Sequence, residues 1–205
     1  MADRAAELGI GILGLTDHNS ARNLEAFDQC CRNQDVLPIY GIEVTTREEI
    51  HVTCYFEMLK TASLFGRFIE SLLPNIPHNP EKLGDQVYVN ADNEILGEID
   101  RSLYSACEIT FEQLLSEVQG YNGVFIPAHI DRPAFSVTSQ IGFLPDLPYS
   151  AVEVVRLPTR INTYNHRLIT NSDAHYLEHM GLRSWEADLP DRSFQALKHY
   201  LEQKF

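Results

Sequence analysis

Short apolar runs alternate with helical segments along this 205-residue chain. The apolar runs, which we predict as strands, cover residues 10–15, 36–44, 50–56, 123–128, 151–155 and 167–171. Strands that alternate with helices are typical of a mainly parallel α/β sheet or barrel. The length and an ordinary balance of hydrophobic (44%) and charged (22%) residues fit a single domain over residues 1–205.

Residues 81–108 interrupt this alternation. Residues 86–99 have the pattern of a β-hairpin with a turn at residues 90–93. A helix is predicted next, around Tyr104. We interpret residues 81–108 as a small hairpin and helix insertion that projects from the main domain.

The charge of the chain limits its partners. Sixteen basic and 29 acidic residues give a formal net charge of −13, which repels a polyphosphate backbone and argues against duplex nucleic acid as a partner. Short oligonucleotide ends stay open as partners, because bound cations can invert the local field.

No apolar run reaches the roughly 20 residues of a membrane helix. With a polar N-terminus and no C-x-x-C pair among four cysteines, we predict a cytoplasmic protein without membrane contact.

Imidazole and carboxylate side chains interrupt or follow the predicted strands. They are Asp17, His18, Glu43, His51, His129, Asp173 and His175. In α/β barrels the active site is built where the strands end, and imidazole with carboxylate is a ligand set for zinc, manganese or iron. Each residue alone also fits a plainer role, such as a helix cap or a hydrogen-bonded histidine. The convergence of several strands is the stronger indication, and it is missing for four histidines that we interpret as non-ligands: His78, His166, His179 and His199.

These motifs resemble those of the PHP (polymerase and histidinol phosphatase) domain family. The resemblance rests on Leu15-Thr16-Asp17-His18-Asn19, Gly41-Ile42-Glu43-Val44-Thr45 followed by His51, Pro127-Ala128-His129, and Asn171-Ser172-Asp173-Ala174-His175. It implies a distorted seven-stranded (β/α) barrel with up to three divalent metal ions. It also implies a supporting role for Asp17, and metal ligands at His18, Glu43, His51, His129, Asp173 and His175.

One motif of that family is missing. Its members begin with a strand that carries His-x-His, whereas no two of the eight histidines here are two residues apart. The chain begins inside what resembles the following helix, so we expect a barrel truncated by its first strand, with fewer metal ions and impaired hydrolysis. The edge of the strand at residues 10–15 would then be unpaired, which favours self-association.

The resemblance implies hydrolysis of a phosphomonoester or nucleotide phosphate on a small phosphorylated substrate, by metal-activated water. Arg132, three residues after His129, is predicted to bind the substrate phosphate as a bidentate clamp, and a surface salt bridge fits it equally well. Two alternatives stay open: an amidohydrolase-like metal hydrolase, and a non-catalytic metal-binding or regulatory module. The substrate is open among sugar phosphates, amino-alcohol phosphates, nucleotides and oligonucleotide ends.

Overall fold

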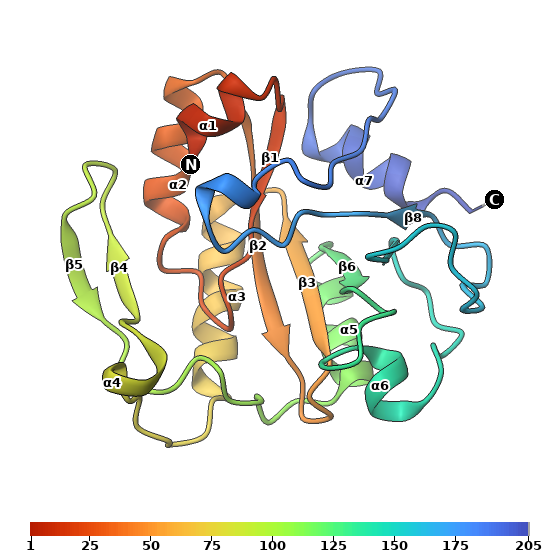
Figure 1. The fold of residues 1–205 in the computed structure, drawn as a ribbon, viewed down its shortest axis with the longest axis horizontal. Coiled ribbons are helices and arrows are strands. Elements are labelled where there is room, and N and C mark those ends of the chain that lie inside the picture. Colours follow the sequence, from red (N-terminus) through yellow and green to blue (C-terminus); the bar gives the residue numbers. More distant parts are fainter. Residues whose placement is uncertain (205) are drawn as a thin grey trace.

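The computed structural model describes residues 1–204, and its centre is a four-stranded sheet in the order β1-β2-β3-β6 (Figure 1). The strands are β1 (Ile12–Leu15), β2 (Leu37–Thr45), β3 (His51–Phe56) and β6 (Val124–Pro127). β1 pairs with β2 in parallel, whereas β3 is antiparallel to both β2 and β6. The sheet is therefore mixed, and the expectation of a mainly parallel sheet is wrong for β3.

The direction of β3 follows from the short connection that precedes it. A parallel crossover needs about a dozen residues or more, and only residues 46–50 join β2 to β3. Two backbone hydrogen bonds close this turn, from Thr46 N to Ile50 O at 2.9 Å and from Glu49 N to Thr46 O at 2.8 Å. The amino end of β3 therefore lies at the same edge of the sheet as the carboxyl ends of β1, β2 and β6.

Side chains of the central strand β2 alternate between two packed faces of the sheet. Ile42 and Val44 join the larger core, which includes side chains of helices α2 (Leu24–Asn33), α3 (Leu59–Ser71) and α5 (Phe111–Gly120). Ile39 joins a smaller cluster on the other face, with Phe194 near the end of the chain. Because Glu43 lies between Ile42 and Val44, the alternation directs its side chain to this second face.

The remaining helices are short and lie at the periphery or in the last third of the chain. They are α1 (Ala2–Glu7), α4 (Pro80–Leu83), α6 (Val137–Ile141), the 3₁₀ helix η1 (Leu177–His179) and α7 (Phe194–Glu202). Within residues 1–204, no helix combines the length and the hydrophobicity that a membrane crossing requires.

Two further strand pairs lie outside the main sheet. β4 (Val87–Val89) and β5 (Ile95–Glu98) form the predicted hairpin, which projects from one side of the molecule (Figure 1). β7 (Val152–Glu153) and β8 (Leu168–Ile169) form a parallel pair. The three sheets do not join among the described residues, so the structure is a mixed α/β fold and the predicted distorted barrel is not confirmed.

β1 ends the main sheet and pairs with β2 alone among residues 1–204. The free edge from which the sequence predicts self-association is thus present. Self-association itself stays a prediction.

The predicted helix around Tyr104 is wrong, because the backbone there is held in a turn by side chains from elsewhere in the fold. Nδ2 of the buried Asn19 donates to the carbonyl oxygens of Leu103 (2.8 Å) and Ser105 (3.1 Å). Oδ1 of Asn19 accepts from the backbone N–H of Thr45 at 2.9 Å. Asn19 therefore connects the loop after β1, the end of β2 and the loop that carries Tyr104.

Asn19→Ala should lower the free energy of unfolding by about 3 kcal/mol, because it leaves three backbone groups without these partners. Asn93→Ala is a matched control: Asn93 has the same left-handed conformation (φ 64° against 50°) but lies exposed in the hairpin turn. Urea unfolding of both variants separates the loss of hydrogen bonds from the backbone cost. Equal losses in the two variants would contradict the connecting role of Asn19.

Candidate metal centre

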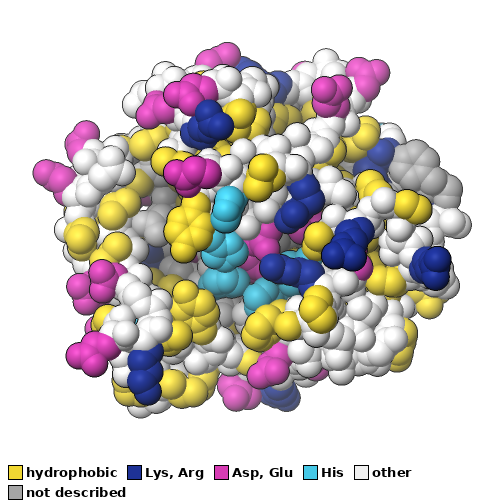
Figure 2. Space-filling view, viewed as in Figure 1, with side chains coloured by type: hydrophobic (Ala, Val, Ile, Leu, Met, Phe, Trp, Pro, Cys, Tyr) yellow, Lys and Arg dark blue, Asp and Glu magenta, His cyan; other side chains and the backbone are white. Residues whose placement is uncertain are grey.

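The carboxylate of Glu43 lies inside a cluster of histidine rings. Nδ1 of His51 is 2.9 Å from Oε1 of Glu43, and Nε2 of His129 is 3.4 Å from the same oxygen. Donor atoms of His18, Glu43 and His51 all lie within 4.8 Å of one another. Histidine side chains are visible at the surface as a cyan column in Figure 2, so the cluster faces solvent on one side.

The mixed sheet brings these residues together. His18 follows β1 and forms an isolated parallel bridge with Glu43, while His129 follows the end of β6. His51 opens β3 opposite Thr45 of β2. Three of the four residues thus come from the carboxyl-terminal part of a strand, as expected, and His51 comes from the amino end of the reversed strand, which the sequence analysis did not foresee.

The surroundings favour the charge states that bind a cation. Burial raises the pKa of Glu43, but the neighbouring His129 and His51 outweigh it and bring that pKa below the ordinary 4.5. Burial lowers the pKa of His18 below 6.5. An ionised carboxylate beside a neutral imidazole is the combination that coordinates divalent metal ions.

His129 is buried, and its ring nitrogens are poorly satisfied. Its side chain is 2% exposed; Nδ1 has no hydrogen-bond partner among the described residues, and Nε2 has only the long 3.4 Å contact with Glu43. Its backbone has a φ of 32°, which is uncommon outside glycine. Unpaired buried polar atoms cost free energy, and a metal ion would give one of them a partner. The residues present therefore fit the divalent ion that the predicted ligand set implies.

Asp173 and His175 border the same cleft as His18 and Glu43. The exposed ring of His175 lies 6.2 Å from the ring of His18, measured between centroids. Asp173 forms an ion pair with Arg132, with 2.7 Å between Oδ2 and Nη1. All six predicted ligands thus lie in one region of the molecule, and their role as ligands stays a prediction.

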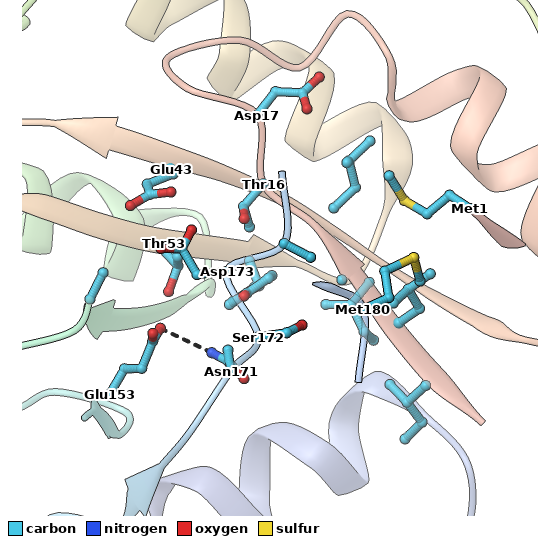
Figure 3. A pocket seen from close by; sticks show the side chains of 18 of the residues that line it. Met1, Thr16, Asp17, Glu43, Thr53, Glu153, Asn171, Ser172, Asp173 and Met180 are labelled. Atoms are coloured by element: carbon cyan, nitrogen blue, oxygen red, sulfur yellow. Dashed lines mark hydrogen bonds between the residues drawn. The ribbon is translucent and has the colours of Figure 1, made fainter. Parts of the chain in front are cut away.

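The side chain of Asp17 is oriented differently from those of the predicted ligands. Its carboxylate accepts a hydrogen bond from Nδ2 of Asn23 at 2.8 Å and points away from Glu43 (Figure 3). Its backbone oxygen accepts from the N–H of Glu43 at 3.1 Å. These contacts hold the loop that carries His18. A supporting role toward a ligand or a nucleophilic water stays a prediction.

Two of the histidines interpreted as non-ligands have contacts elsewhere, and a third is exposed. His78 lies 2.6 Å from the carbonyl oxygen of Gly84, and the buried His166 packs against the ring of Tyr149. His199 is exposed on α7.

A cleft of about 1030 Å³ opens beside the cluster. Residues of β1 line it, together with residues from the last third of the chain, among them Met180 and Trp185. Thr53 and Glu153 also line it (Figure 3). The free edge of β1 therefore borders an open space.

Glu153 is a buried carboxyl group in this cleft that the sequence analysis missed. It is 3% exposed and accepts a hydrogen bond from Asn171 at 3.0 Å (Figure 3). Burial raises its pKa from 4.5 to about 7. A signal was present: Glu153 alternates with the apolar Val152 and Val154, which places it on the opposite face from them, the face of Glu43.

Glu153→Gln should stabilise the metal-free protein more at about pH 8 than at about pH 5, by roughly 2 kcal/mol. The folded state binds the Glu153 proton more tightly than the unfolded state, so this contribution is complete below pH 4.5 and is lost as the pH rises through about 7. Glutamine keeps the acceptor for Asn171 and cannot ionise. Urea unfolding in a chelator measures the effect, and an equal difference at both pH values would contradict it.

The chain matches the PHP domain family over residues 1–130, which is more than half of its 205 residues. It belongs to the PHP family, as its motifs predict. A search of curated protein sequences gave no match.

Two solved structures of endonuclease Q share the fold. One is the lesion-specific endonuclease PfuEndoQ from Pyrococcus furiosus, and the other is an endonuclease Q complex with a 27-mer duplex substrate that has an abasic lesion at the active site. Each has a TM-score of 0.62 and 14% sequence identity, and the match covers 98% of this chain and 50% of the other. The chain thus spans about half the length of these endonuclease Q chains.

A third structure is a candidate metal-dependent phosphoesterase from Bifidobacterium adolescentis. It matches 64% of this chain and 61% of its own length, with 14% identity and a TM-score of 0.46, which is too low to define a shared fold.

Proposed function

We propose that this chain is a metal-dependent phosphoesterase that hydrolyses a phosphomonoester or nucleotide phosphate. The observation that carries the proposal is the convergence of donor atoms from His18, Glu43 and His51 within 4.8 Å. Membership of the PHP family supports the same class of reaction and favours it over the amidohydrolase-like alternative. The proposed ligands are His18, Glu43, His51 and His129, with Asp173 and His175 beside them.

The chemistry supplied by bound divalent ions is Lewis acidity, which lowers the pKa of a coordinated water and offsets the charge of a phosphate. The protein contributes orientation. Phe135 stacks on His51, with ring centroids 4.7 Å apart and an angle of 15° between the planes, and so fixes the plane of that imidazole. Arg132 is 45% exposed, so its guanidinium can bind a phosphate oxygen while Nη1 stays paired with Asp173.

We propose that the chain binds fewer ions than a family member that has His-x-His. The carboxylate of Asp173 is paired with the guanidinium of Arg132 in the structure. Because Arg132 already balances part of the negative charge of Asp173, this carboxylate attracts a further metal ion less strongly. Zinc, manganese and iron all suit imidazole with carboxylate.

Nucleic acid is a second substrate class that the fold favours. An endonuclease Q of similar fold is bound to a 27-mer duplex with an abasic lesion at its active site. This goes against the expectation, drawn from the net charge of −13, that a duplex is not a partner. Lys and Arg side chains gather on one flank of the histidines in Figure 2, so the surface at the site is less acidic than the whole. We therefore include strand ends and lesion-bearing duplexes among the substrates to be tested.

His129→Ala should lower the zinc or manganese bound per chain, and should slow hydrolysis of a chromogenic phosphomonoester by more than about tenfold, since loss of even an outer contact at a metal site commonly has that effect. The measurements are elemental analysis after dialysis and steady-state turnover of the same samples.

His199→Ala is the matched control, because His199 is an exposed histidine on α7 and should leave both values unchanged. Unchanged metal content in His129→Ala would contradict the site. Metal binding by the wild type without turnover would instead support a non-catalytic metal-binding module.

A further inference from the structure

An exposed aromatic ring stands next to the histidine cluster. The ring of Tyr104 lies 5.9 Å from that of His18, measured between centroids, and Tyr104 borders the same cleft as Glu43. Tyr104 is 57% exposed. A tyrosine in this position offers a flat apolar surface to whatever binds at the cluster.

The loop that carries Tyr104 is held in place on both sides of the ring. Asn19 donates to the carbonyl oxygens of Leu103 and Ser105, and Oε1 of Gln86 accepts from the N–H of Leu103 at 2.8 Å. Because the backbone is already ordered, stacking on Tyr104 carries a smaller entropic cost than stacking on a mobile ring. Asn19 directly follows His18, so the same residue ties the ring to the proposed metal site.

The two flanks of the cluster differ in chemistry. Arg132 pairs with Asp173, and Arg183 donates to the carbonyl oxygens of Asn171 and Ser172. Figure 2 shows hydrophobic side chains along one flank of the histidines and basic side chains along the other. A ligand that matches this arrangement has a phosphate at the histidines, within reach of a guanidinium, and a planar group a short distance away.

We propose that Tyr104 is the platform on which the base of a nucleotide, or of a nucleic-acid end, stacks while its phosphate lies at the histidine cluster. The inference rests on the proposed function and narrows its substrate class to nucleotides. A sugar phosphate has no planar group to cover the ring. A quaternary ammonium group also binds aromatic faces, but it favours a cage of several rings, whereas Tyr104 presents one tyrosine ring beside His18.

The test compares binding of non-hydrolysable phosphonate analogues of AMP and of ribose 5-phosphate, and of phosphocholine, by calorimetry on the manganese-loaded protein. We expect the AMP analogue to bind about tenfold more tightly than the ribose analogue, in line with base–aromatic stacking. Tyr104→Ala should remove that preference and leave affinity for the ribose analogue unchanged, and Tyr104→Phe should keep it. Phe143→Ala is the control, since Phe143 is similarly exposed (60%) and is not among the residues that line the cleft.

The possible outcomes separate this inference from the proposed function. If wild type binds both analogues and Tyr104→Ala weakens both equally, the platform is overturned while the phosphoesterase site stands. Preference for phosphocholine that depends on Tyr104 overturns the nucleobase in favour of a cationic head group. If the wild type binds neither analogue, the proposed function is overturned together with this inference.

Discussion

The ionised carboxylate of Glu43 is the group on which the site depends. It is 6% exposed, and a buried charge is tolerated only where partners compensate for its lost hydration. His51 and His129 supply that compensation from two other segments of the sheet, at 2.9 and 3.4 Å. The contact of His129 is too long for a good hydrogen bond, and its Nδ1 has no partner among the described residues. The cluster thus compensates the charge of Glu43 only in part and leaves His129 without a good hydrogen bond, and a bound cation would supply both needs.

The reversal of β3 makes this arrangement possible. Had β3 run parallel to β2, His51 would lie at the far edge of the sheet from His18 and His129. The tight turn at residues 46–50 fixes the reversal, and Asn19 then holds the loop after β1 against the end of β2. On the other side, β1 has a free edge beside an open cleft. The fold thus has one well-connected side, which carries His18, His51, His129 and Glu43, while Asp173 and His175 come from the last third of the chain and line the same cleft as His18 and Glu43.

Local patterns predicted the parts of the structure that are determined locally. Apolar runs that stop at His18 and at His129 located β1 and β6 and the side chains beyond them. Buried strands are built from consecutive apolar residues, and polar residues follow where such a strand ends. The direction of β3 could have been predicted from the five residues before it. Glu153 was missed although its alternation with Val152 and Val154 indicated its face, because a single carboxylate in a buried strand is not distinctive without neighbouring ligands. Closure of a barrel depends on pairing between distant strands, about which the sequence of each strand says little. The turn at Tyr104 is imposed by hydrogen bonds from Asn19, which is far away in the chain.

Anomalous X-ray diffraction from crystals grown with manganese or zinc tests the central claim most directly. The account predicts a peak bonded to a carboxylate oxygen of Glu43, with imidazole nitrogens of His18, His51 or His129 as further ligands at about 2.1 Å for zinc. A map with no peak at Glu43, or with peaks only at exposed carboxylates elsewhere, would contradict the account.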